Sequence, residues 1–380
     1  MDHLAKALDQ LREDNLYRTR KLNSTAQNVE PIINGQKVLS FCSNDYLGLA
    51  NHPKVIERFV NAANESGVGS GASHLITGHH ESHNALEEEL AEFIGCEQVL
   101  LFSTGYMANL GVVSSLATRN SSIFADKLNH ASLNDAALLS RAKLSRYAHQ
   151  DMVQLEKNIA INNSVSKIIL TDGVFSMDGT VAPVKTLQLI ANQHDAILII
   201  DDAHGIGVLG KHGKGCTENL LSNDEILIGT LGKAFGTFGA FVAAKKETIE
   251  WIIQKAHSYI YTTALPVAIA EATRTSLQLI NSEAWRRKHL QELIQHFQDR
   301  CKQTGIKVSA SSTPIQPIIL GSSETALHVS KKLLESGILV PAIRPPTVPN
   351  NTARLRISFS ANHTKEQIDR LLLALEQLVT

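Results

Sequence analysis

Short apolar runs alternate with helical segments through the middle of the chain. Helical periodicity is clear in segments such as 84–94 and 187–194. Runs that are apolar on both faces, separated by helices, are typical of a mostly parallel sheet covered on both sides. The pattern therefore predicts an α/β fold built on such a sheet. The apolar runs that carry this prediction are 99–102, 168–170, 197–200 and 226–228.

The length and one charged helix suggest how this fold is divided. A chain of 380 residues is long enough for two domains at roughly 150 residues each. A charged amphipathic helix is expected over 283–303, and 309–317 and 341–351 have the composition of connections. We therefore expect a large domain over 51–283 and a smaller α+β domain over 284–380. The N-terminal segment 1–50 is expected to pack on the smaller domain.

Composition excludes several classes of protein. Lys and Arg number 36 against 37 Asp and Glu, so no basic excess favours nucleic acid as a partner. The four cysteines are far apart and form no CxxC motif, as expected in a reducing cytoplasm. The N-terminus is charged and lacks the apolar core of a signal peptide. Polar residues interrupt the uncharged run 98–118, which favours a strand followed by a helix over a membrane span.

Chemically useful side chains follow the predicted strands. Asp201 and His204 come after the third run, and Thr230 and Lys233 come after the fourth. In parallel sheets, ligands bind at the carboxyl ends of the strands. We therefore expect an acid, a histidine and a lysine to meet at one edge of the sheet.

Two other motifs are weaker. The stretch 205–210 has the form GxGxxG, but His212 stands where a phosphate loop needs Ser or Thr, so we expect a tight loop. His79 and His83 have the i, i+4 spacing of zinc ligands, but no third ligand is evident and HExxH is absent. We therefore expect surface or packing histidines at a helix start, and no metal site. No GxSxG motif supports a serine hydrolase.

Lys233 is the most informative residue. It lies among glycines and alanines rather than on a charged helix face. A lysine in such a site has its neutral amine favoured and can form a Schiff base. Asp201 could hold the proton of a pyridinium nitrogen. The helix expected to begin near Gly105 and Tyr106 could bind a phosphate, together with Thr230. These groups are the requirements of pyridoxal 5′-phosphate (PLP).

The motifs resemble those of the α-oxoamine synthases. This family consists of fold-type-I PLP enzymes that condense an amino acid with an acyl thioester and release CO₂. The blocks that carry the resemblance are 44–49, 103–109, 129–132, 174–179, 201–205 and 229–233. Blocks 232–236 and 343–349 are most similar to the biotin-pathway member, which takes L-alanine and a pimeloyl thioester of coenzyme A or a carrier protein. The resemblance thus implies a cytoplasmic, homodimeric PLP-dependent acyltransferase.

The resemblance also implies a role for each matching residue. Lys233 would bond to PLP, Asp201 would pair with the ring nitrogen, and His130 would stack on the ring. His204 and Ser176 would contact the ring oxygen. Phosphate contacts would come from Gly105, Tyr106 and Thr230, and, from the partner subunit, Thr262 and Thr263. Arg344 would bind the amino-acid carboxylate. Other substrate contacts would come from Arg18, Asn44, His130 and Thr347.

Other functions remain open at this point. A relative with another substrate pair, such as glycine with acetyl-CoA, would share these blocks. An aminotransferase of the same fold would also bind PLP, and a non-catalytic scaffold would bind nothing. Asn350 and Asn351 replace a turn that often contains glycine, and Phe238 replaces a small residue. These departures leave the preferred acyl chain length open.

Overall fold

The computed structural model describes residues 2–220 and 225–379. The chain divides into two compact units. The large unit comprises Leu49–Ser176 and Val181–Arg287, and the small unit comprises Met1–Gly48, Met177–Thr180 and Lys288–Thr380.

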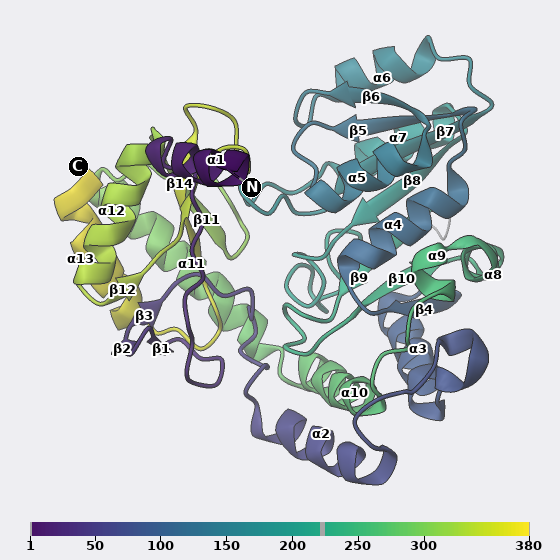
Figure 1. Ribbon diagram of the computed structural model, residues 1–380, viewed down its shortest axis with the longest axis horizontal. Coiled ribbons are helices and arrows are strands. Elements are labelled where there is room, and N and C mark those ends of the chain that lie inside the picture. Colours follow the sequence, from purple (N-terminus) through teal and green to yellow (C-terminus); the bar gives the residue numbers. More distant parts are fainter. Residues whose placement is uncertain (1, 221–224, 380) are drawn as a thin grey trace. The chain divides into compact units, whose positions relative to one another are not determined.

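A seven-stranded sheet forms the centre of the large unit (Figure 1). Its strand order is β4-β10-β9-β8-β7-β5-β6; β10 is antiparallel to both of its neighbours, and the other pairings are parallel. The predicted α/β fold with a mostly parallel sheet is therefore confirmed. The strands are β4 (Gln98–Phe102), β5 (Ser121–Asp126), β6 (Lys143–Tyr147), β7 (Ser166–Asp172), β8 (Ala196–Asp201), β9 (Ile226–Thr230) and β10 (Ala240–Ala244).

Helices cover both faces of this sheet, which explains why its strands are apolar on both sides. Ile168 and Leu170 of β7 belong to a core cluster with side chains from α4, α5, α8 and α9. Ile169 lies between them and points to the opposite face, yet it is also buried. Contacts of α3 with β4, α6 with β5 and α7 with β8 cover that second face. These helices are α3 (Glu81–Ile94), α4 (Gly105–Leu116), α5 (Ala131–Ser140), α6 (Met152–Ala160), α7 (Val184–Gln193), α8 (Lys246–Lys255) and α9 (His257–Ile260).

Three further elements complete the large unit. Helix α2 (Pro53–Ser66) packs against α10 (Val267–Ser282). A single π-helical turn, η1 (His74–Gly78), precedes α3 and contacts α9. Segment 98–118 forms β4 and then α4, as expected. Among the described residues, no helix is both long and apolar enough to cross a membrane.

The small unit combines short sheets with helices. Its three-stranded sheet has the order β11-β14-β13, and all its pairings are antiparallel. β3 pairs with β12 in parallel, and β1 pairs with β2. The strands are β1 (Ile32–Ile33), β2 (Gln36–Lys37), β3 (Leu39–Ser40), β11 (Ile315–Gly321), β12 (Ile338–Leu339), β13 (Ala342–Ile343) and β14 (Ala353–Ser358). The helices are α1 (Asp2–Glu13), α11 (Trp285–Thr304), which contains the unit boundary, α12 (Ser323–Glu335) and α13 (Lys365–Val379).

The two segments expected to be connections are partly strands. β11 begins at Ile315, inside 309–317, and β13 lies inside 341–351. Ile315 is fully buried and pairs with Ser358 of β14. The turn-like composition was therefore a wrong guide here, because pairing with a distant strand outweighs local propensity.

Candidate active site

A cavity of about 210 Å³ lies at the carboxyl edge of the large unit's sheet. Asp172 and Asp201 end the neighbouring strands β7 and β8 and are register partners. Ligands bind at this edge in open α/β sheets. The residues that line the cavity are Gly105, Tyr106, Asn109, His130, Ser132, Asp172, Val174, Ser176, Asp201, Ala203, His204, Thr230 and Lys233.

Lys233 enters the cavity from a tight turn that follows β9. The amide of Gly236 donates to the carbonyl of Lys233 at 2.9 Å. Gly236 has φ +68°, and a Cβ there would lie 2.3 Å from the backbone nitrogen of Ala50, so the turn requires glycine. Nζ of Lys233 lies 2.8 Å from Nε2 of the buried His204. The small residues around Lys233 thus allow close backbone packing that aims its amine into the cavity.

Asp201 is held by two hydrogen bonds. Asn109 Nδ2 donates to Oδ2 at 2.6 Å, and the amide of Ala203 donates to Oδ1 at 3.0 Å. Asn109 Nδ2 also lies 2.8 Å from Ser132 Oγ. Asn109 was not among the predicted site residues. Its spacing of four residues from Gly105 on α4 could have identified it, because positions i and i+4 share a helix face.

His130 is anchored at the start of α5. It is the N-cap residue of that helix, and its Nδ1 lies 2.7 Å from Ser132 Oγ. Its amide donates to the Asp172 carboxyl at 3.1 Å. Burial lowers the pKa of His130, although the charge of Asp201 acts in the opposite direction. Burial, with the nearby Asp201, raises the pKa of Asp172 well above its ordinary value. The two neighbours of Asp201 therefore favour their neutral forms.

The N-terminus of α4 forms another wall of the cavity. Thr104 caps the helix, and its Oγ1 accepts the amide hydrogen of Met107 at 3.2 Å. At Gly105, an added Cβ would meet no atom within 4 Å, so space remains above the first turn. Thr230 Oγ1 accepts the amide hydrogen of Gly232 at 3.3 Å. Free N–H groups at a helix N-terminus favour phosphate.

These residues fit PLP. The cavity combines a lysine amine for the aldehyde, a fixed carboxylate for the ring nitrogen and an open helix N-terminus for the phosphate. Asn109 Oδ1 is buried beside the carboxylate and has no hydrogen-bond partner among the described residues. Tyr106 also borders the cavity, and its hydroxyl donates to Asp135, a bond that raises the pKa of Tyr106.

The other predicted site residues lie elsewhere in the chain. Thr262 and Thr263 lie in the large unit, in the segment that follows α9. Arg18, Asn44, Arg344 and Thr347 belong to the small unit, and their roles stay predictions.

Within the small unit, three of those residues are neighbours. Burial and the nearby Arg18 charge lower the pKa of Arg344. The amide of Thr347 donates to the carbonyl of Arg344 at 3.1 Å. Asn44 Oδ1 accepts from Arg356 Nη2 at 3.2 Å. The arrangement groups two guanidinium ions, which are the groups that best bind a carboxylate.

The GxGxxG stretch forms a loop, as expected, and no helix opens within it. Its glycines make room for buried carboxylates. A Cβ at Gly205 would lie 2.1 Å from Asp202 Oδ1, and one at Gly210, where φ is +84°, would lie 2.0 Å from Glu218 Oε2. Asp202 is fully buried and accepts from the amide of Cys216 at 2.7 Å. These glycines thus allow the backbone to pack closely around the carboxyl groups. Carboxyl groups in this position are incompatible with a phosphate bound at the same place.

Comparisons with known proteins agree with this geometry. Residues 36–375 match the family described as aminotransferase class I and II. An 8-amino-7-oxononanoate synthase from Thioalkalivibrio sulfidiphilus is 51% identical over 99% of this chain and 97% of its own length. The enzyme of the same name from Saccharophagus degradans is 50% identical over 99% and 96%.

Solved structures of related enzymes are also similar to this chain. A serine palmitoyltransferase from S. paucimobilis, with bound PLP-myriocin aldimine, is similar with a TM-score of 0.93 at 28% identity. The match covers 99% of this chain and 96% of that one. An 8-amino-7-oxononanoate synthase from Francisella tularensis has a TM-score of 0.78 at 35% identity, over 90% and 97%. The chain belongs to the 8-amino-7-oxononanoate synthases, within the class I and II aminotransferase family.

Proposed function

We propose that this chain is a PLP-dependent acyltransferase of biotin biosynthesis. It condenses L-alanine with a pimeloyl thioester and releases 8-amino-7-oxononanoate, CO₂ and the free thiol. The observation that carries the proposal is the position of Lys233 Nζ, 2.8 Å from His204 Nε2, in a cavity that also contains Asp201. Membership of the synthase family at about half sequence identity supports the choice of substrates.

Lys233 and Asp201 have different roles in proton transfer. When bound, PLP supplies an electron sink that stabilises negative charge on the amino-acid α-carbon. Lys233 Nζ removes the α-proton of L-alanine and later returns a proton to the same carbon. His204 Nε2 orients that amine through their 2.8 Å contact. Asp201, held by Asn109 and the Ala203 amide, keeps a proton on the ring nitrogen.

The remaining cavity residues bind and orient. His130, with its pKa lowered by burial, presents a neutral flat ring. The open first turn of α4 at Gly105 supplies backbone N–H groups for phosphate, and Thr230 adds a hydroxyl. Ser176 lines the same cavity and would contact the ring oxygen.

Arg344 is proposed to bind the carboxylate of L-alanine. A guanidinium offers two parallel N–H donors, a geometry that lysine lacks. The neighbouring Arg18 adds positive charge, and Asn44 and Thr347 are proposed as further substrate contacts. The acyl donor is proposed to be a thioester of coenzyme A or of an acyl carrier protein.

The working form is proposed to be a homodimer, in which Thr262 and Thr263 reach the partner's phosphate site. Exposed apolar side chains in this part of the chain support this: Val68 is 85% exposed, Ile76 75% and Tyr261 77%. The amide of Ala264 donates to the carbonyl of Ala72 at 2.9 Å, which joins the segments that carry them. Contiguous exposed apolar surface marks protein interfaces.

The cytoplasm is the proposed compartment. Cys42, Cys96, Cys216 and Cys301 are all free, and disulfides are rare in a reducing cytoplasm.

Product analysis tests the reaction. The holoenzyme is offered L-alanine or glycine with pimeloyl-CoA, acetyl-CoA or a pimeloyl carrier protein, and the products are identified by mass spectrometry. The proposal predicts 8-amino-7-oxononanoate from L-alanine and a pimeloyl thioester. A preference for glycine with acetyl-CoA would instead identify another α-oxoamine synthase. Pyridoxamine formation with a keto acid would identify an aminotransferase, and binding no PLP would identify a scaffold.

A further inference from the structure

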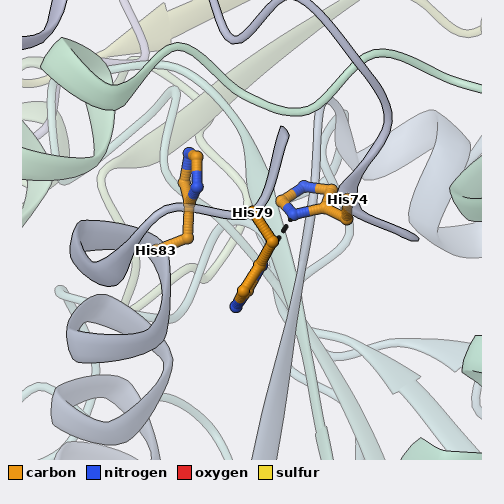
Figure 2. Close-up of side chains that lie close together, drawn as sticks. All are labelled: His74, His79 and His83. Atoms are coloured by element: carbon orange, nitrogen blue, oxygen red, sulfur yellow. Dashed lines mark hydrogen bonds between the residues drawn. The ribbon is translucent and has the colours of Figure 1, made fainter. Parts of the chain in front are cut away.

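Three histidines meet in the large unit, in residues that the PLP site does not use. His74 opens η1, His79 follows that turn, and His83 lies in the first turn of α3. Each offers a ring nitrogen, and these three nitrogens all lie within 4.8 Å of one another (Figure 2). The sequence indicated only the pair His79 and His83. His74 is the third member of this cluster, and the sequence did not reveal it, because a π-helical turn folds it back onto the pair.

Close backbone packing brings His74 and His79 together. A Cβ at Gly78 would lie 2.1 Å from the carbonyl oxygen of Ala72, so only glycine allows this turn to close. The result places Nδ1 of His74 2.9 Å from Nδ1 of His79, a contact drawn as a dashed line in Figure 2. The His74 ring also stacks on Tyr259, with centroids 5.1 Å apart. Two imidazole nitrogens are thus held at about the separation of two ligands on one ion.

The outer contact of His83 resembles that of a metal ligand. His83 Nε2 lies 2.6 Å from the carbonyl oxygen of Leu265. Metal-ligating histidines commonly donate their second N–H to a backbone carbonyl or a carboxylate, which fixes the ring. His83 Nδ1 accepts the amide hydrogen of His80 at 2.9 Å, a bond that would be exchanged for the ion.

We propose that His74, His79 and His83 bind one divalent transition-metal ion of the class that prefers imidazole, with Zn²⁺ as the expected ion. Imidazole nitrogens suit Zn²⁺, whereas Mg²⁺ and Ca²⁺ prefer oxygen ligands. Three protein ligands leave a fourth position for water. The ion would join η1 and α3 and, through the bond between His83 and Leu265, the segment that carries Thr262 and Thr263. Its site is separate from the PLP cavity.

The test is Zn²⁺ binding by the chelator-treated, PLP-loaded enzyme. Calorimetry and metal analysis should give one Zn²⁺ per chain. His79→Gln removes the most accessible of the three proposed ligands, so the folding of this variant should be least affected. Because a direct ligand is lost, its Zn²⁺ affinity should fall by at least the roughly 10- to 100-fold that follows loss of a residue hydrogen-bonded to a ligand. His328→Gln changes an exposed histidine on α12 of the small unit and should leave the affinity unchanged. Bound PLP absorbance and thermal unfolding check that each variant is folded.

A second measurement tests the proposed zinc site even if His79→Gln does not fold. X-ray absorption at the zinc edge of the wild-type protein should give three imidazole nitrogens around the ion. Absence of stoichiometric binding, equal affinity in folded His79→Gln and wild type, or a coordination shell without imidazole would each overturn the proposal.

Discussion

At the scale of single residues, the site depends on how its charged groups are held. Asp201 acts through a carboxylate whose two oxygens accept from Asn109 and from the Ala203 amide. Burial lowers the pKa of His130 and raises that of Asp172, so both neighbours of Asp201 favour their neutral forms. Asn109 is therefore a positioning residue for Asp201.

Asn109→Ala should lower kcat about 10- to 100-fold, because a hydrogen bond to a charged group is worth roughly 1.5–3 kcal/mol. PLP should still bind, since Lys233 and the first turn of α4 are unchanged. Steady-state kinetics and the absorbance of bound PLP measure the two effects. Asn84→Ala, which changes an asparagine bonded to Glu88 on α3, should leave both unchanged. An unaltered kcat in Asn109→Ala would show that Asp201 does not need the hydrogen bond from Asn109.

Part of this site could be predicted from the sequence. Asp201, His204 and Lys233 were predicted to meet because each follows a parallel strand, and all three line one cavity. Asn109 and Asp201 are 92 residues apart, and their contact depends on how α4 packs on the sheet. Such a partnership leaves no local pattern in the sequence.

At the scale of elements, helix N-termini serve different purposes in the two units. Thr104 caps α4 at the cavity, and Ser322 caps α12 in the small unit. Each hydroxyl accepts the amide hydrogen of the residue three positions on. The two caps are therefore equivalent in local structure, and only the first stands beside the proposed phosphate position.

Thr104→Ala and Ser322→Ala should each lower the free energy of unfolding by about 1 kcal/mol. Only Thr104→Ala should also weaken PLP binding, because its cap fixes the turn whose N–H groups bind phosphate. Urea unfolding measures the first effect, and PLP titration of the apoenzyme measures the second. The same PLP affinity in both variants would argue against a phosphate site at α4.

A buried histidine links distant elements of the small unit. His363 Nδ1 accepts from the Ser360 amide, and its Nε2 lies 3.0 Å from the carbonyl oxygen of Ser40 in β3. The ring stacks on Phe41 with centroids 4.5 Å apart. Burial lowers the pKa of His363 to about 4. The folded protein thus holds this ring neutral at pH values where an unfolded chain would protonate it.

The stability contributed by His363 should therefore decrease as the pH is lowered from about 6.5 to about 4. In this range the unfolded chain binds the extra proton, so acid favours unfolding. His363→Gln should be less stable than wild type at pH 7, and the gap should narrow by about 3 kcal/mol at pH 4. Urea unfolding of both proteins across this range measures the gap. A gap independent of pH would mean that the folded protein protonates His363 normally.

Elements of the small unit were also the hardest to predict. The central strands were visible because both of their faces are buried, which leaves continuous apolar runs. β13 has two residues and β11 begins in a segment rich in Ser and Pro. Their pairing with β14 comes from residues distant in the sequence, so local composition indicated connections instead.

At the scale of the whole molecule, the proposed active form contains two copies of the chain. The proposed homodimer would cover the exposed apolar side chains of Val68, Ile76 and Tyr261. Thr262 and Thr263 adjoin this surface in sequence, which matches their proposed role across an interface.

Sedimentation velocity should give a species of twice the 41.4 kDa chain mass. Ile76→Glu places a charge in the proposed interface and should shift the equilibrium towards monomer with loss of activity. Val165→Glu, a change at a residue 97% exposed outside this surface, should leave the dimer intact. A wild-type protein that sediments as a monomer while fully active would contradict this arrangement.

The central claim is that Lys233 bonds to PLP, and one measurement tests it directly. Borohydride reduces an imine between lysine and PLP to a stable amine, so peptide mass spectrometry of the reduced holoenzyme locates the attachment. We predict the phosphopyridoxyl group on Lys233, at about one per chain, and its loss in Lys233→Ala. Attachment to another lysine, or no attachment in an active enzyme, would contradict the account.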